Sequence, residues 1–404
     1  MGRIIIFTGK GGVGKTSIAA AHAVRAASEG KKTLLVSADM APNLGDIFET
    51  EVGGNAVPAG DNLYLLELDP DQLVRENYPN ISKAMRNLFG SSGLALDNLD
   101  DEMIIPGFEN IFSLLKIRDI YNSGEYDLII VDCAPTGETL SLLKLPELLS
   151  WYMEKFYPVG KTMVRVMAPV SKAKYKVTLP NRKAMNEIEQ MHWSLVALQE
   201  LLKDPDVSSV RLVCTPEKMV VDETKRSYMY LNLYHYQVDG VFINRILPDD
   251  AGSDFMNHWG SIQKKYIREL ESVFAGIPIT RIAWYPHEVR GRAAIQHLCD
   301  DVLGDKDILN VRVHTDNEIY EACDGGWSLT IRLPGAAKED VTVYQHEMDV
   351  NIKVNNFNRC IPLPNTLTGA QIDGWDVADG FLRIQFSKKA DGQDETAEAG
   401  KDGK

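Results

Sequence analysis

Short apolar runs alternate with helix-like stretches over the first three quarters of the chain. Uninterrupted apolar runs such as "LIIV" are typical of parallel strands that are covered on both faces. The runs that favour strands are Ile4–Phe7, Thr33–Ser37, Leu63–Leu68, Leu128–Val131, Val210–Cys214, Val238–Asn244 and Ile279–Trp284. Amphipathic segments between them, including Ser17–Glu29 and Thr224–Tyr234, complete a βαβ pattern. We therefore predict an α/β domain with a doubly wound parallel sheet over residues 1–300, with ligands at the carboxyl ends of its strands.

The pattern changes after residue 300. The stretch "CDDVLGDKDILN" is acidic and contains a glycine, which predicts a linker over residues 301–310. From there, "WSLTIRL", "DVTVYQ", "DVNIKV" and "FLRIQF" alternate apolar and polar positions with a period of two. Residues 311–388 are therefore predicted to form a small all-β sandwich domain. The polar tail at 389–404 has almost no apolar side chains, so we expect it to be disordered.

Composition narrows the class of protein. The 404 residues suit two domains, and 44% hydrophobic with 25% charged residues is ordinary for a soluble globular protein. A net charge of −14 argues against general nucleic-acid binding. The five cysteines form no CxxC pair, which favours buried thiols in a reducing compartment. With no signal peptide and no apolar stretch of membrane-span length, the sequence predicts a cytoplasmic protein.

The segment "TGKGGVGKTS" follows the first strand and opens the first helix. It matches the phosphate-loop pattern G-x-x-x-x-G-K-[ST] in the structural context that this motif requires. Lys15 is predicted to neutralise the β- and γ-phosphates, and the Thr16 hydroxyl to bind Mg²⁺. The other predicted nucleotide contacts in this segment are Gly9, Gly11, Gly12, Val13, Gly14 and Ser17. The expected ligands are therefore a nucleotide and Mg²⁺.

Two aspartates follow other strands of the predicted sheet. Asp39 ends the second strand and Asp132 ends the strand "LIIVD". Parallel strands bring their carboxyl ends to one edge, where carboxylates can orient the attacking water or hold Mg²⁺ through a water. Either aspartate alone could instead cap a helix. Beside a phosphate loop, we interpret Asp39 and Asp132 as catalytic residues and as water-mediated Mg²⁺ ligands.

The second lysine of the loop, Lys10, is unusual for this motif. A loop lysine is commonly just solvated. The whole string "GKGGVGKT", however, resembles the deviant phosphate loop of arsenite-pump ATPases, tail-anchored-protein targeting factors, partition ATPases and nitrogenase iron protein. The resemblance implies that Lys10 is a catalytic residue that reaches the nucleotide of the other subunit, and that the protein is a homodimer.

Further segments resemble the ArsA-type branch of that group. "SADMAPNLGDIF" is similar to its first switch, which assigns Asp39 to water polarisation and adds Asn43 and Asp46. "DCAPTGETL" is similar to its second switch through Asp132, Pro135, Thr136 and Gly137, although Glu138 replaces a histidine and Met40 a proline. "VFINRILP" and "YPHEVRG" resemble the adenine-side segments, which nominates Asn244 and Pro286 as nucleotide contacts.

Cysteine spacing separates the members of this branch. Targeting members often carry a CxxC pair that closes a shared zinc site, so no zinc is expected here. The cysteine clusters of arsenite-stimulated pumps and of iron–sulfur proteins are not matched either. Cys133, beside Asp132, is interpreted as a small packed residue. An arsenite-efflux role is therefore disfavoured at the level of sequence.

Residues 71–125 and 151–205 are predicted to be helical regions inserted in the ATPase domain. Positions 151–191 hold five of the thirteen methionines and eight Lys or Arg against three Glu. Methionine suits a groove that accepts varied apolar helices, and the basic residues could contact a client's flanks, a membrane or a membrane receptor. An ordinary core stripe with a solvated basic face explains the same pattern.

The second domain resembles the α-crystallin domain of small heat-shock proteins. The similar positions are "LPG" at 333–335, "KED" at 338–340, "IPLP" at 361–364 and Gly380 before the last strand. The resemblance implies binding of exposed apolar segments, while a dimerisation or spacer module remains the alternative.

Together these features predict a dimeric Mg²⁺-dependent ATPase that handles hydrophobic clients such as tail-anchored membrane-protein segments, without nucleic acid. The alternatives are a nucleotide-switched scaffold of the partition-ATPase kind, a holdase regulated by its ATPase, and an arsenite-efflux ATPase subunit.

Overall fold

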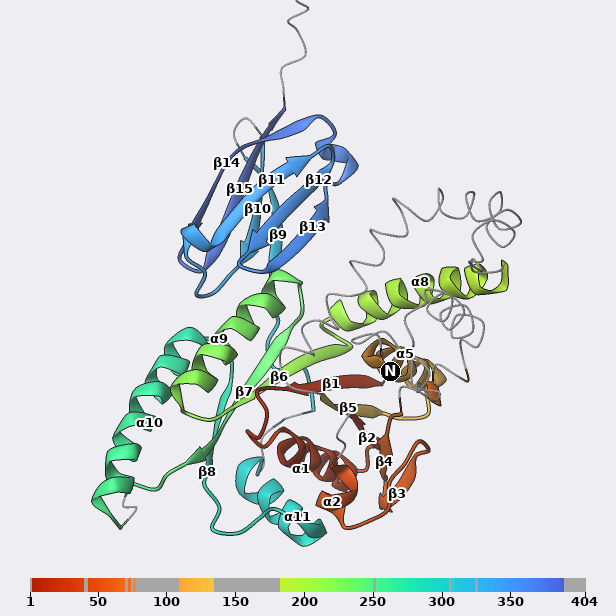
Figure 1. Cartoon of the computed structure of the whole chain (residues 1–404), viewed down its shortest axis with the longest axis vertical. Coiled ribbons are helices and arrows are strands. Elements are labelled where there is room, and N and C mark those ends of the chain that lie inside the picture. The colour runs from red at the N-terminus through yellow and green to blue at the C-terminus, as the bar shows by residue number, and fades with distance from the viewer. Residues whose placement is uncertain are drawn as a thin grey trace, which may run out of the picture. The chain divides into compact units, whose positions relative to one another are not determined.

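The computed structural model describes residues 2–39, 43–69, 72–73, 76, 109–133, 182–249, 252–304, 307, 309–323 and 326–388. The chain divides into two compact units, Met1–Thr315 and Asp316–Lys404 (Figure 1). The boundary falls within the region where the sequence pattern changes from mixed α/β to alternating strands.

The first unit is built on an eight-stranded sheet in the order β3-β4-β2-β5-β1-β6-β7-β8. All neighbouring strands are parallel except the edge pair β3–β4, which is antiparallel. The strands are β1 (Arg3–Thr8), β2 (Thr33–Ala38), β3 (Val57–Gly60), β4 (Leu63–Glu67), β5 (Leu128–Cys133), β6 (Ser208–Cys214), β7 (Val238–Ile246) and β8 (Ile279–Ala283).

Helices cover both faces of this sheet, which is why its central strands are buried along their whole length. Every residue of β1, β2, β5 and β6 is buried. Helices α1, α2 and α11 lie on one face, and α5 and α8 lie on the other (Figure 1). Helices α9 and α10 contact each other and the strands β6 and β7. The helices are α1 (Lys15–Ser28), α2 (Leu44–Phe48), α5 (Glu109–Ser123), α8 (Arg182–Lys203), α9 (Lys218–Leu233), α10 (Asp254–Val273) and α11 (Gly291–Val302).

A buried ionic cluster joins Arg3 and Asp239, near the amino ends of β1 and β7, to Arg211 in the middle of β6. The Asp239 carboxylate accepts hydrogen bonds from Arg3 Nη2 at 2.8 Å and from Arg211 Nε at 3.1 Å. The side chains of Arg211 and Asp239 are fully buried. Burial alone would raise the pKa of Asp239, but the two guanidinium groups outweigh it and lower that pKa. The carboxylate is therefore ionised and paired inside the protein.

The chain after α11 runs against this cluster. Arg3 Nη1 donates to the carbonyl oxygen of Leu309. Further along, Gln237 Nε2 donates to Thr315 Oγ1 at 2.9 Å, and Thr315 N donates back to Gln237 Oε1 at 3.2 Å. The described residues between 307 and 315 are thus attached to the first unit, where the sequence analysis placed part of a linker.

The second unit consists of two antiparallel sheets, ordered β14-β15-β10-β9 and β11-β12-β13. Alternation creates its core, since Val350, Ile352 and Val354 of one sheet and Leu382 and Ile384 of the other have no exposed surface. The strands are β9 (Glu318–Cys323), β10 (Gly326–Arg332), β11 (Val341–His346), β12 (Asp349–Val354), β13 (Phe357–Pro362), β14 (Ala370–Ala378) and β15 (Phe381–Lys388); short 3₁₀ turns span Lys338–Asp340 and Asn365–Leu367.

The predicted fold class is confirmed in both units. The sequence analysis did not predict four strands, β3, β9, β13 and β14, and it began α9 too late, at Thr224 instead of Lys218. Most of the two predicted helical insertions (77–108 of the first and 151–181 of the second, including most of the methionine-rich segment) and the tail at 389–404 lie outside the described residues. Among the helices of the described ranges, none has both the length and the apolar character needed to cross a membrane.

Candidate nucleotide site

The glycine loop lies between the last residue of β1, Thr8, and the first residue of α1, Lys15. Gly12 and Gly14 have left-handed backbones, with φ of 77° and 97°. Gly14 precedes α1, and no side chain caps the helix there. The first N–H groups of α1 are therefore available to an anion, as in other phosphate loops.

The four glycines of the loop form two pairs, and the physical reason for having glycine differs between the pairs. A Cβ on Gly9 would lie 2.1 Å from the Val213 carbonyl oxygen, and one on Gly14 would lie 2.4 Å from Asn244 Nδ2. Protein atoms thus require glycine at these two positions. At Gly11 and Gly12 a Cβ would meet nothing within 4 Å. The open space beside this second pair is where phosphates can approach the backbone.

The two lysines of the loop are engaged differently. Lys15 is buried, with 8% of its surface exposed, and its Nζ donates to the Lys10 carbonyl oxygen at 3.4 Å. The Lys10 side chain is about one third exposed, and its Nζ lies 3.7 Å from Glu223 Oε2 of α9. Lys15 therefore stays against its own loop, while Lys10 is paired with a neighbouring helix.

Sheet topology brings the predicted carboxylates to the loop. Asp132 of β5 is in register with Phe7 of β1 on one side and Ser37 of β2 on the other. Asp39 is the first residue beyond β2. Asp132 is almost fully buried, whereas Asp39 is half-buried.

The electrostatics of Asp132 show which groups surround it. Burial raises the pKa of Asp132 to about 6, and the nearby negative charge of Asp39 acts in the same direction. A side-chain hydrogen bond with Thr16 and the charge of Lys15 oppose this rise. The predicted set Lys15, Thr16, Asp39 and Asp132 is thus close together. Asp132 Oδ1 is buried and has no hydrogen-bond partner among the described residues, so it can accept one from a ligand or its hydration shell.

Of the other predicted nucleotide contacts, the structure links only some to the phosphate loop. Asn244, in β7, donates from Nδ2 to the Val13 carbonyl oxygen at 2.8 Å and accepts from Arg245 N at 2.9 Å. It therefore supports the phosphate loop, and its contact with the adenine stays a prediction. Pro286 is exposed between β8 and α11, and Asn43 is exposed directly before α2. Ser17 is half-buried in the first turn of α1.

Sequence reasoning missed two features of this site. The Val213 carbonyl oxygen fixes Gly9, and Glu223 pairs with Lys10. A backbone oxygen leaves no trace in residue identity, and one glutamate on a charged helix carries no motif. The second-switch residues Pro135, Thr136, Gly137 and Glu138, with Met40 of the first switch, lie outside the described residues.

All five cysteines are free thiols, and Cys133, Cys214 and Cys299 are buried as predicted. The prediction of buried thiols is wrong for Cys323, which is exposed, and for Cys360, which is half-buried. Within the described ranges, no group of three or more His, Cys, Asp or Glu side chains is arranged to hold a metal ion.

A glycine loop between a buried strand and a helix, with a buried lysine and strand-end carboxylates around it, defines a P-loop nucleotide hydrolase. The model of the anion-transporting ATPase family matches residues 2–304, and that of an HSP20-like domain found in ArsA matches residues 324–386. The chain belongs to this ArsA-type ATPase family, and its activity is ATP hydrolysis. The predicted family and the crystallin-like second domain are thereby confirmed.

Relatives carry two kinds of name. A "Putative arsenical pump-driving ATPase" of Chlorobaculum tepidum is 34% identical over 394 residues, 97% of either chain. A protein of the same name, numbered 1, from Aquifex aeolicus is 32% identical over 95% of this chain and 100% of its own. "ATPase get3" of Pyrenophora tritici-repentis is 28% identical over 73% of this chain and 89% of its own.

Proposed function

We propose that this chain is a Mg²⁺-dependent cytoplasmic ATPase that acts as a homodimer and binds apolar helical segments under the control of its nucleotide. The observation that carries the proposal is the convergence of Lys15, Thr16, Asp39 and Asp132 on the open side of the glycine loop.

The donor set suits Mg²⁺ as the companion of a nucleotide triphosphate. A hydroxyl and two carboxylates are hard oxygen donors, and the buried Oδ1 of Asp132 lacks a protein partner. Thr16 would bind the ion directly, and Asp39 and Asp132 through water. When bound, Mg²⁺ would neutralise charge that develops on the phosphates.

The proposal assigns a role to each predicted residue of the nucleotide site. The loop N–H groups and Lys15 bind the phosphates, while Asn43, Asn244 and Pro286 lie on the nucleoside side. Asp39 orients the attacking water, and Asp132 senses the γ-phosphate. Lys10 stabilises transition-state charge on the partner subunit's nucleotide, because its side chain is directed out of its own loop.

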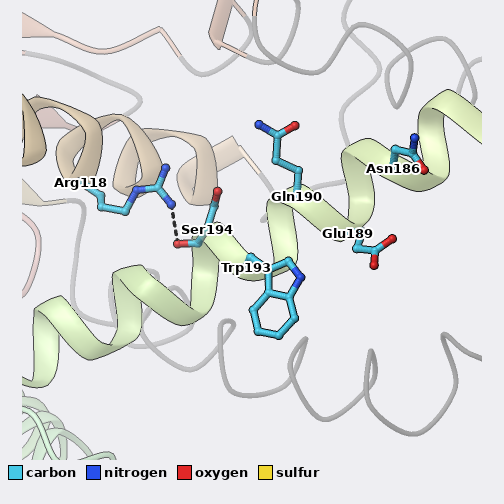
Figure 2. Close-up of a pocket in the computed structure, with 6 residues that line it drawn as sticks. All are labelled: Arg118, Asn186, Glu189, Gln190, Trp193 and Ser194. Carbon is cyan, nitrogen blue, oxygen red and sulfur yellow. Dashed lines mark hydrogen bonds between the residues drawn. The ribbon is translucent and has the colours of Figure 1, made fainter.

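A surface hollow between α5 and α8 supports the client-binding part of the proposal. Figure 2 shows Arg118 of α5 donating to the Ser194 carbonyl oxygen of α8, at 2.8 Å, beside the indole of Trp193. The hollow has a volume of about 540 Å³, and Trp193 is 64% exposed. The other lining residues are Asn186, Glu189 and Gln190. An exposed indole with a polar rim suits one apolar side chain of a helical segment. This hollow lies on α8, and the first part of that helix, residues 182–191, is the end of the methionine-rich segment 151–191.

Two tryptophan substitutions, one at the hollow and one elsewhere as a control, test the proposed client site. A labelled apolar helical peptide of about 20 residues, the length of a membrane span, is mixed with the protein and its nucleotide is exchanged. We expect co-elution that changes with nucleotide state, and about tenfold weaker binding for Trp193→Ala, because that indole supplies a desolvated anchor. Trp259→Ala, which removes a 40% exposed indole from α10, is the control.

The alternatives have distinct outcomes in the same assay. ATP turnover with no peptide association at any nucleotide state would favour the partition-type scaffold. Peptide binding that persists without nucleotide and maps to residues 316–388 would favour a holdase role. Stimulation of turnover by arsenite would favour the function named for two of the relatives.

A further inference from the structure

The side chain of Lys10 already has a partner on its own subunit. Its Nζ lies 3.7 Å from Glu223 Oε2, and the two side chains are 34% and 27% exposed. The Lys10 backbone meanwhile accepts a hydrogen bond from Lys15 Nζ. The main-chain carbonyl of Lys10 is thus bonded within the loop, while the Lys10 side chain extends to α9.

Helix α9 holds Glu223 in a fixed place. The helix contacts β6 and β7, and Ser227 Oγ donates to the Glu223 carbonyl oxygen at 2.9 Å. The neighbouring Asp222 is paired within α9, since Lys225 Nζ lies 3.3 Å from Asp222 Oδ1. Lys225 also donates to Glu269 of α10. Glu223 is thus the carboxylate that this helix directs to the phosphate loop.

We propose that Glu223 is a positioning residue that holds Lys10 in cis in the free subunit and releases it when a second subunit's nucleotide competes for the same ammonium group. This inference rests on the proposed dimer. To reach a nucleotide on the other subunit, the Lys10 side chain has to leave Glu223, so the cis pair and a trans phosphate contact compete for the same side chain. A pair that is about one third exposed is weak enough to exchange, and the more negative phosphates attract the cation more strongly.

The Lys10–Glu223 pair should therefore disfavour closure of the dimer by a small amount. Removing the Glu223 charge frees Lys10, so closed dimers form at lower protein concentration. Exposed ion pairs of this kind change an equilibrium by about two- to fivefold. Salt screens such a pair, so the difference should shrink at high ionic strength.

The test measures MgATP turnover per subunit against protein concentration in the full-length chain. For Glu223→Gln we expect half-maximal turnover at about two- to fivefold lower concentration than wild type, with the maximal rate unchanged. Asp222→Asn, one position away and 45% exposed, is the matched control and should behave as wild type. In a Lys10→Gln background, which has no turnover to measure, MgATP-dependent dimer formation is followed by analytical ultracentrifugation. There Glu223→Gln should not shift the protein concentration at which dimers form, because Glu223 acts through Lys10.

Several outcomes would overturn the inference. A Glu223→Gln curve that coincides with wild type and Asp222→Asn, while Lys10→Gln still loses turnover, rejects the cis pair and leaves the proposed dimeric ATPase standing. An equal effect of Glu223→Gln with and without Lys10 shows that Glu223 acts elsewhere. Turnover per subunit that is constant at all concentrations rejects the dimer itself, and the competition with it. Thermal melting of each variant identifies any loss caused by misfolding.

Discussion

Ion pairs lie at opposite ends of the eight-stranded sheet, and they differ in how much water reaches them. Near the amino ends of β1 and β7, Arg3 and Arg211 share the carboxylate of Asp239 with almost no exposed surface. At the carboxyl ends, Lys10 and Glu223 form a pair that is about one third exposed. The first pair cannot open without leaving a buried charge uncompensated, whereas the second can exchange its partner with water or phosphate at little cost.

This difference separates the parts of the molecule that maintain the fold from those that can change with nucleotide. The buried cluster ties β1, β6, β7 and the segment after α11 together. The exposed pair connects the phosphate loop to α9, a helix at the side of the site. The following predictions test this contrast, beginning with the largest expected effect.

Asp239→Asn should destabilise the full chain by about 3–5 kcal/mol, because two buried guanidinium groups lose their counter-charge. Urea unfolding followed by circular dichroism measures the change. Glu29→Gln removes an exposed i,i+4 partner of Arg25 and should cost about 0.3–0.5 kcal/mol. Equal changes for the two variants would show that the buried cluster does not anchor the fold.

Lys15→Ala should lower the MgATP turnover number at least about hundredfold, because it removes a preorganised charge from the phosphates. The loss should be the same at every protein concentration, since Lys15 lies against its own loop. Steady-state kinetics, with nucleotide binding measured separately, checks this. Turnover within a few-fold of wild type would remove the glycine loop from the reaction.

The raised pKa of Asp132 should appear in the stability of the nucleotide-free protein. The folded state holds this proton more tightly than the unfolded chain does, since the pKa is about 6 against an ordinary value of 3.8. Its contribution to stability therefore falls by about 2–3 kcal/mol as pH rises from about 4 to 6. Urea unfolding in a chelator at several pH values should show this slope in wild type and lose it in Asp132→Asn. An identical slope in both would place the titration on another group.

Gly11→Ala should leave the melting temperature unchanged and weaken nucleotide binding about tenfold, because its Cβ enters open space that the phosphates need. Gly9→Ala should lower the melting temperature instead, because its Cβ would overlap the Val213 carbonyl oxygen. Calorimetry measures the melting temperatures of both variants, and nucleotide titration measures their affinities. If both variants changed melting temperature and nucleotide binding in the same way, glycine would be needed at the two positions for the same physical reason.

The sequence was sufficient for the central strands and for the convergence of Lys15, Thr16, Asp39 and Asp132. Uniform burial gives those strands runs of consecutive apolar residues, and parallel pairing brings their ends together. The missed strands have weaker patterns. Strand β3 is the four-residue edge "VPAG", and β9 has no buried position. In β14 a register shift between Ile372 and Gly374 breaks the alternation.

Two contacts of the site could not be predicted from the sequence, because they join residues that are far apart in the chain. Asn244 was predicted from a resemblance as an adenine-side contact, but its bond to the Val13 carbonyl oxygen depends on how the loop folds. Glu223 lies 213 positions from Lys10 and became visible as its partner only in three dimensions. Contacts between distant residues of common types have no local signature.

The most direct test of the central claim is ATP turnover by a mixture of two inactive variants, Lys10→Gln and Lys15→Ala. In a mixed dimer, the first variant keeps an intact phosphate loop and the second donates Lys10 to it. For random pairing of equal amounts, half of the dimers are mixed and each has one complete site, so turnover should recover to about a quarter of wild type. A mixture no more active than either variant alone would contradict the action of Lys10 across a dimer.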